Sequence, residues 1–270
     1  MKIGETTTAV VTGAAGGLGR AIALELSRRG ARLLLTDIDE KGVGATAEEI
    51  RRRGGRAESM RCDVAKLEEQ EAVAARSDEL FGRTDLLVNN AGVAASGLLG
   101  EMPLDDWRWV MGINLWGPIY GCHLWVPRMK RAGSGHILNV ASIAGVASAP
   151  LMGPYNVTKA GVIALSETLA AEVEREGIGV TALCPFFFQT NVLGASRQTG
   201  DTAMVGVAAK LMRDSKLTAD DVASIGLDAC ERGTLYCMPH LEAKAIWGLK
   251  RLTGERFRKL AALLQRRYER

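Results

Sequence analysis

Apolar residues occur in short, nearly continuous runs along the first 185 residues of this chain. These runs predict β-strands at 8–13, 32–37, 57–63, 85–92, 136–142 and 179–185. Such runs are typical of parallel strands that are buried on both faces of a sheet. Between them, apolar residues recur at helical spacing, as in 19–30 and in 159–177, where Gly177 closes the pattern.

The repeated alternation of strand and helix predicts an α/β fold in which a doubly wound parallel sheet is flanked by helices. No Pro/Ser-rich linker, internal repeat or low-complexity tract divides the chain, so we expect a single domain over residues 1–240. Ligands of such sheets bind beyond the carboxyl ends of the strands. We therefore expect the functional residues at those strand ends.

Composition narrows the class of protein. With 47% apolar and 24% charged residues, the 270-residue chain has an ordinary globular composition. We expect no signal peptide, and no apolar run approaches the roughly 20 residues that a membrane span needs. Five cysteines without CxxC spacing predict reduced, mostly buried thiols in a cytoplasmic protein. Three scattered histidines lack metal-ligand spacing, so we expect no metal site.

Charge is concentrated at the C-terminus. Residues 241–270 carry nine Lys or Arg against three Asp or Glu, which leaves residues 1–240 at −3 and gives no indication of nucleic-acid binding. This segment predicts a basic amphipathic extension, with apolar residues at largely helical spacing: Ile246, Leu249, Phe257, Leu260, Leu264 and Tyr268. Such a stripe can make peripheral membrane contact or pack on protein. Gly248, Thr253 and Gly254 interrupt it, which argues against one continuous surface helix. We favour packing on the domain or on a neighbouring subunit, because apolar helix stripes are most often buried in protein.

The first predicted strand runs directly into TGAAGGLG, residues 12–19, which opens the first predicted helix. Glycines there allow a tight turn and let a pyrophosphate approach the helix amides. Asp37 ends the next strand, eighteen residues beyond Gly19. Its carboxylate can accept both adenosine ribose hydroxyls and would repel a 2′-phosphate. The sequence thus predicts a Rossmann-type domain that prefers NAD to NADP. The alternative is that Asp37 is simply an acidic residue in a turn.

The segment 142–159 contains candidate catalytic residues. Tyr155 and Lys159 are four positions apart at a predicted helix start, so their side chains project from one face. A lysine cation about 4 Å away would lower the tyrosine pKa by about three units, toward the pH at which acid–base catalysis works best. Ser142, at the end of the preceding strand, can hydrogen-bond a substrate oxygen beside the tyrosine.

Together these motifs resemble those of the short-chain dehydrogenase/reductase family, over about residues 7–192. The glycine turn resembles the family's TGxxxGxG, NNAG occurs at 89–92, and YxxxK matches Tyr155 and Lys159. The resemblance implies that Tyr155 donates or accepts the proton. It also implies that Lys159 holds the nicotinamide ribose and lowers the tyrosine pKa. Ser142 would polarise the carbonyl, and Asn114 would support a proton relay through water.

The resemblance also implies further cofactor contacts. Asp63 and Val64 match positions that contact adenine, and Asn90 matches one that contacts the adenosine ribose. Thr190, with the backbone of Phe188, would hold the carboxamide. The residues expected at the cofactor are Gly13, Gly17, Leu18, Gly19, Asp37, Asp63, Val64, Asn90, Gly92, Tyr155, Lys159, Pro185, Phe188 and Thr190.

The sequence CPFFFQT, residues 184–190, places three phenylalanines after the sixth predicted strand. The resemblance places this segment over the nicotinamide, followed by a mobile lid at about 191–218. Because adjacent side chains alternate in direction, we expect Phe186 and Phe187 to contact substrate and at least one ring to pack in the core. The alternative is that all three are structural. Other residues near the predicted walls are also apolar: Ala94, Ala95, Ala144 and Met152.

Two features depart from the family's pattern. Pro185 is followed by Phe186 where Pro-Gly is common, and GTLYCMPH replaces an Asp-Gly-Gly-like turn near the end. The sequence predicts an NAD-dependent dehydrogenase that interconverts a small apolar secondary alcohol and a ketone. The resemblance implies a homodimer or homotetramer. Two alternatives stay open: an NADPH-dependent carbonyl reductase, and a non-catalytic dinucleotide-binding regulatory protein.

Overall fold

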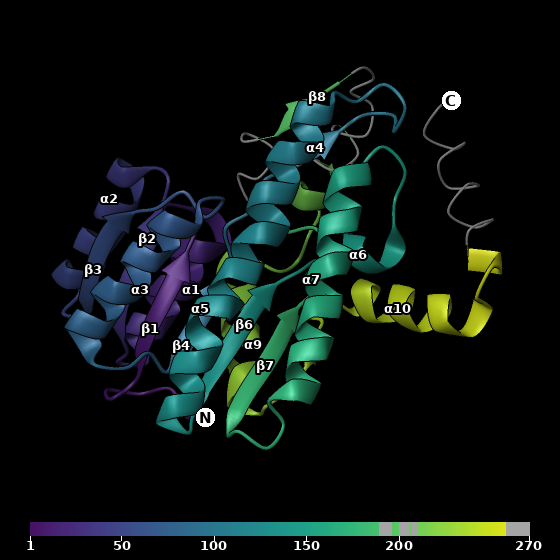
Figure 1. Cartoon of the computed structure of the whole chain (residues 1–270). Coiled ribbons are helices and arrows are strands. Elements are labelled where there is room, and N and C mark those ends of the chain that lie inside the picture. The colour runs from purple at the N-terminus through teal and green to yellow at the C-terminus, as the bar shows by residue number, and fades with distance from the viewer. Residues whose placement is uncertain (189–195, 200–205, 207–209, 258–270) are drawn as a thin grey trace.

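The computed structural model describes residues 1–188, 196–199, 206 and 210–257. Its centre is a parallel sheet with the strand order β3-β2-β1-β4-β6-β7-β9 (Figure 1). The strands are β1 Thr8–Thr12, β2 Arg32–Asp37, β3 Arg56–Arg61, β4 Leu86–Asn89, β6 Gly135–Val140, β7 Ile178–Leu183 and β9 Tyr236–Cys237. The predicted doubly wound α/β fold is confirmed.

Helices cover both faces of the sheet (Figure 1). One face packs against α1 Gly17–Arg28, α2 Glu40–Arg52 and α9 Ala219–Glu231, and the other against α3 Leu67–Phe81, α5 Gly117–Ala132 and α7 Gly153–Glu172. The central strands β1 and β4 are buried along their whole length. Burial on both faces explains why their sequences are continuous apolar runs rather than alternating ones.

Smaller elements lie at the carboxyl ends of the strands. They are β5 Ala95–Ser96, which pairs with β8 Arg197–Gln198, and the helices α4 Leu104–Met111, η1 Gly112–Trp116 and α6 Ala144–Ala147. The strand order reverses between β1 and β4, and ligands of such sheets bind at this switch point. The predicted lid, 191–218, is described only at 196–199, 206 and 210–218.

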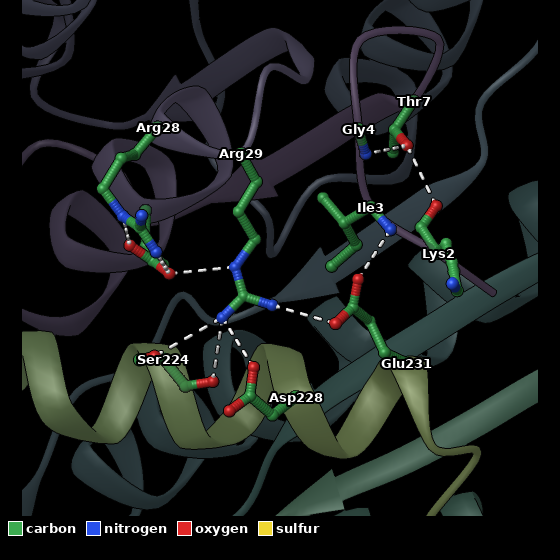
Figure 2. Close-up of polar contacts among 10 residues, drawn as sticks. Lys2, Ile3, Gly4, Thr7, Arg28, Arg29, Ser224, Asp228 and Glu231 are labelled. Atoms are coloured by element: carbon green, nitrogen blue, oxygen red, sulfur yellow. Dashed lines mark hydrogen bonds and ion pairs between the residues drawn. The ribbon is translucent and has the colours of Figure 1, made fainter.

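A charged network joins α1, α9 and the N-terminal segment (Figure 2). Arg29, just after α1, donates to Glu25 at 2.9 Å and to Asp228 on α9 at 2.7 Å. It also donates to one carboxylate oxygen of Glu231 at 3.3 Å. The other carboxylate oxygen of Glu231 accepts from the Ile3 N–H at 2.8 Å. The Arg29 side chain is only 12% exposed, so this network fixes α1 against α9 and secures the N-terminal segment.

Several element boundaries differ from the sequence predictions. Helix α7 begins at Gly153 rather than 159, because Pro154 in its first turn has a φ already suited to a helix. It ends at Glu172, and Gly177, with φ +71°, lies in the turn before β7. Strand β4 ends at Asn89 because the Asn90 N–H donates to the Thr12 hydroxyl instead of a sheet partner.

The C-terminal extension begins with α10, Leu241–Thr253, which packs against α6 (Figure 1). Ala243, Ile246 and Trp247 pack in a cluster with Ile143 and Val146, so this part of the extension packs on its own domain. No helix in the described part of the chain is both long and apolar enough to cross a bilayer.

All five cysteines are buried and unpaired: Cys62, Cys122, Cys184, Cys230 and Cys237. Burial raises the pKa of Cys237 to about 11 and that of each of the others to about 12. The thiols are therefore protonated at neutral pH, as expected for structural cysteines.

Candidate active site

The glycine turn forms a tight cradle between β1 and α1. Gly13 has φ +69°, and a Cβ there would lie 2.7 Å from the Ala91 Cα, so only glycine fits. The Asn90 side-chain amide donates to the carbonyl oxygens of Thr12 at 2.9 Å and Gly13 at 3.0 Å. Asn90, expected at the adenosine ribose, thus also holds the glycine turn against the end of β4.

Asp37 joins the glycine turn to the end of β2. Its Oδ2 accepts from the Ala15 N–H at 2.9 Å and its Oδ1 accepts from the Asp39 N–H at 3.0 Å. Each carboxylate oxygen retains a second lone pair for a ligand hydroxyl. Beside it, Ile38 is 59% exposed and lines the same cavity. Ile38 was not expected at the site, although it directly follows the acid that the sequence predicts at the ribose.

A cavity of about 490 Å³ runs along the carboxyl ends of the strands. Its size is within the usual range for a ligand site. Every residue expected at the cofactor lines it except Thr190, which lies outside the described residues. The expected substrate residues Ser142, Tyr155, Phe186 and Phe187 line it as well. The structure thus brings the predicted cofactor and substrate residues to one continuous cavity.

Asn114 lies beside the cavity, in the π-helical turn η1, and is fully buried. Its Oδ1 accepts from the Val93 N–H and its Nδ2 donates to the Val93 carbonyl oxygen, both at 2.8 Å. The same Nδ2 lies 3.4 Å from the Thr158 hydroxyl. A π-turn re-aims side chains locally and is frequent at functional sites. Here it makes Asn114 the link between the loop after β4 and helix α7.

Ser142 and Tyr155 meet at the end of the cavity where the sequence predicts the substrate. Ser142 follows β6, and its hydroxyl accepts from the Ala144 N–H at 3.1 Å. Tyr155 projects from the first turn of α7. Burial raises the pKa of Tyr155 from its ordinary value, and a hydrogen bond with Ser142 partly opposes this increase. A neutral phenol and a hydroxyl are therefore close enough to hold one substrate oxygen together.

Lys159 lies on the same face of α7, one turn further along, and is only 4% exposed. Its Nζ donates to the Val140 carbonyl oxygen at 2.7 Å and lies 5.7 Å from the centroid of the Tyr155 ring. Burial lowers its pKa to about 8.

The expected decrease of the Tyr155 pKa is wrong. It assumed a lysine cation about 4 Å from the phenol. In the structure, burial has the larger effect on Tyr155, and the Lys159 ammonium is directed to a backbone carbonyl.

The three phenylalanines are not equivalent. Phe188 is 7% exposed and packs in the core cluster that contains Leu183 and Leu227, whereas Phe186 and Phe187 are half-buried. The rings of Phe186 and Phe187 meet edge to face, with centroids 5.1 Å apart. All three contribute to the cavity wall, so the segment forms an apolar wall whose last ring is also anchored in the core.

Other wall residues come from distant segments. Met212, Ala147 and Ala149 line the cavity, but Ala95 is buried against Met102 and Val110 instead. The loop after α6 contains two non-glycine residues with positive φ, Ser148 at +53° and Leu151 at +63°. Such backbone strain is often found at functional sites.

The residues that line this cavity fit a bound dinucleotide. The glycine cradle can approach a pyrophosphate, and Asp37 can accept ribose hydroxyls. Asp63 and Val64 border the same end of the cavity. Among the described residues that line the cavity, Lys159 is the one basic side chain. No group of His, Cys, Asp or Glu that could hold a metal ion occurs in the described part of the chain.

Known proteins are similar to this chain in sequence and fold. A model of the short chain dehydrogenase family matches residues 7–201. EphD of Mycobacterium tuberculosis, named as a probable oxidoreductase, is 33% identical over 265 residues, or 95% of this chain and 45% of EphD. The chain thus spans less than half the length of that relative.

Two further proteins match this chain over most of its length and over most of their own. The (S)-acetoin-forming diacetyl reductase of Staphylococcus epidermidis is 36% identical over 186 residues, which is 68% of this chain and 72% of the reductase. A short chain dehydrogenase/reductase from Burkholderia phymatum, solved in complex with NAD, superposes with a TM-score of 0.87 at 33% identity. That superposition covers 93% of this chain and 95% of the other.

Proposed function

The chain belongs to the short-chain dehydrogenase/reductase family of oxidoreductases, and from this premise we propose that it is an NAD(H)-dependent dehydrogenase that interconverts an apolar secondary alcohol and a ketone. The observation that carries the proposal is the meeting of Ser142, Tyr155 and Lys159 in the cavity that also contains the glycine turn and Asp37. One cavity can thus hold a dinucleotide and a proton-transfer group side by side.

The glycine turn, Asp37 and Lys159 would hold the nicotinamide dinucleotide, which would supply hydride chemistry at the substrate carbon. The Tyr155 hydroxyl gives its proton to the ketone oxygen in reduction and receives it back in oxidation. The Ser142 hydroxyl donates a hydrogen bond to the same oxygen. A neutral phenol, as burial favours here, is ready for the reductive direction.

Lys159 and Asn114 support the proton donor. The Lys159 ammonium would hold the nicotinamide ribose and stabilise the tyrosinate that forms after proton transfer. Asn114 keeps the Val93 peptide in place beside the cofactor region. We propose that its fixed amide also orders the water through which the proton returns to solvent.

NAD rather than NADP is favoured by charge. A 2′-phosphate would meet the Asp37 carboxylate, and no arginine lies among the described residues that line the cavity. The Burkholderia phymatum relative binds NAD. An apolar substrate is favoured by the wall of Phe186, Phe187 and Met152. Such a wall excludes water and offers no charged partner to a polar substrate.

The test is incubation of the purified chain with NAD or NADP and secondary alcohols of increasing carbon number, with the absorbance of the reduced cofactor followed. We expect turnover with NAD that improves as the alcohol becomes more apolar. Turnover only with the phosphorylated cofactor would support the carbonyl reductase instead. Cofactor binding without any turnover would support a regulatory protein.

A further inference from the structure

His240 contacts the phenylalanine wall from outside the cavity. It directly precedes α10 and is 5% exposed, and its Nδ1 accepts from the Phe186 N–H at 3.2 Å. Its ring centroid lies 6.3 Å from those of both Phe186 and Phe188, which is within the range of aromatic pairs. The imidazole therefore holds the backbone of the wall and contacts two of its rings.

The hydrogen bond defines which ring nitrogen of the neutral imidazole carries the proton. Because Nδ1 accepts, the neutral ring carries its proton on Nε2. That Nε2 is buried and has no hydrogen-bond partner in the described part of the chain. A buried donor without a partner destabilises a fold, and a leucine would avoid this cost. What a leucine could not supply is the acceptor for the Phe186 N–H.

Lys250 holds an adjoining part of the cavity wall, since Val146 and Phe186 pack in one cluster. Its Nζ donates to the Val146 carbonyl oxygen at 2.5 Å. Val146 lies in the last turn of α6, where helix carbonyls lack a partner within the helix and lysine side chains often supply one. Helix α6 follows Ser142, and its residues Ala144 and Ala147 line the cavity.

Helix α10 is itself anchored to the domain. The Trp247 ring lies 5.1 Å from the Tyr236 ring, and the Tyr236 hydroxyl donates to Glu167 of α7 at 2.5 Å. The Arg251 guanidinium lies 4.4 Å above the Trp247 ring. The segment that contains α10 is thus fixed to the sheet and to α7. His240 lies at one end of this segment, and Lys250 lies near the other end.

We propose that His240 and Lys250 are positioning residues that fix two adjoining parts of the substrate-pocket wall, the Phe186 segment and α6, and thereby select the substrate. Neither side chain lines the cavity, so each acts through the wall that it holds. The inference rests on the proposed function, because that function identifies the pocket as the substrate site.

The first test needs no turnover. Hydrogen exchange of the Phe186 amide is compared in full-length His240→Leu, His240→Gln and unmodified protein. We expect His240→Leu to accelerate exchange about tenfold, since one protecting hydrogen bond is lost. His240→Gln, which can supply an acceptor, should recover part of the protection. His123→Leu, at an exposed position on α5, is the control. Unchanged exchange in His240→Leu overturns the proposed role of His240.

The second test measures selectivity. Lys250→Met and His240→Leu should change the ratio of kcat/KM for long and short secondary alcohols by about tenfold, the scale of one or two methylenes in a pocket. The NAD dissociation constant should change less than about twofold. Lys244→Met, which removes a charge from an exposed position on α10, should change neither.

A uniform fall in kcat/KM for all alcohols, or an unchanged ratio, overturns the inference. If the unmodified protein turns over none of the alcohols, the proposed function fails. In that case the exchange measurement still decides whether His240 positions the wall.

Discussion

The two ends of the cavity are built in different ways. At the cofactor end, the turns that follow neighbouring strands bond directly to one another, as Asp37 does to Ala15 and Asn90 to Gly13. At the substrate end, residues that do not line the cavity hold the walls. Lys250 donates to the Val146 carbonyl oxygen, and His240 accepts from the Phe186 N–H.

The backbone shows the same difference. At the cofactor end the positive φ angles belong to glycines, such as Gly13 and Gly17, which adopt them without strain. At the substrate end they belong to Ser148 and Leu151, where the surrounding structure must impose them. The cofactor end is therefore built from strand-end turns that bond to one another, whereas the substrate end depends on the C-terminal segment packed behind its walls. Mutations should affect the two ends separately.

The largest effect is expected where the ends meet. Tyr155→Phe removes only the phenolic hydroxyl, so kcat should fall about 10³-fold, within the range for loss of a general acid or base. NAD binding should stay within about threefold. Tyr120→Phe, at a half-buried position on α5, is the matched control. Substantial turnover by Tyr155→Phe would show that the assigned proton donor is wrong.

The phenylalanine wall offers a second test. Phe188→Ala should lower the free energy of unfolding by about 3 kcal/mol, because it opens a cavity in the core. Phe187→Ala, at a half-buried position, should mainly change the preference among alcohols. Thermal unfolding and kcat/KM for the same alcohol series separate the two effects. If both variants lose only stability, the wall is structural and the distinction between the ends weakens.

Lys159 links stability to pH. Burial lowers its pKa from 10.5 to about 8, so between these values the unfolded chain binds more protons and stability rises with pH. Below about pH 8 the buried ammonium destabilises the fold. Lys159→Met should therefore raise the free energy of unfolding at pH 7 by about 1–3 kcal/mol.

That gain should vanish above pH 10.5, where the lysine is neutral in both states. Turnover should be lost in the same variant, because the ammonium has a proposed role at the ribose. Denaturant unfolding at pH 7 and pH 10.5 measures the difference, with the exposed Lys216→Met as control. A variant that is less stable at pH 7 would contradict the predicted cost of this burial.

The smallest expected effect concerns only the cofactor end. The unmodified enzyme should prefer NAD to NADP by at least about tenfold in kcat/KM, or about 1.4 kcal/mol. Asp37→Asn should narrow this preference, since it removes the charge but keeps an acceptor for the Ala15 N–H. Asp39→Asn, which retains a cap for α2, should leave it unchanged. Equal use of both cofactors by the unmodified enzyme would refute the argument from charge.

The sequence was sufficient for the fold and for much of the candidate site because those signals are local. Continuous apolar runs predicted the parallel strands, and the four-residue spacing put Tyr155 and Lys159 on one helical face. The glycine turn could be recognised because its chain conformation requires glycine. Each of these features is fixed by residues within a few turns of one another.

The remaining features depend on burial and on long-range contacts. The pKa of Tyr155 rises rather than falls because the ring is desolvated by the folded chain, which spacing alone does not reveal. His240 and Lys250 were not predicted at the site because their partners lie on other elements. The nearby aromatic pair of Tyr236 and Trp247 likewise joins β9 to α10. These contacts exist only once the sheet has formed.

The buried cysteines give the protein five internal reporters of transient opening. Protonated and shielded thiols react with alkylating reagents only when the surrounding structure opens, so the labelling rate measures local opening. Cys62 lines the cofactor end of the cavity. Cys184 directly follows β7, and Cys237 is the last residue of β9. A bound dinucleotide should therefore slow labelling of Cys62 more than that of Cys184 or Cys237, because ligand binding stabilises the closed form of the region that it contacts.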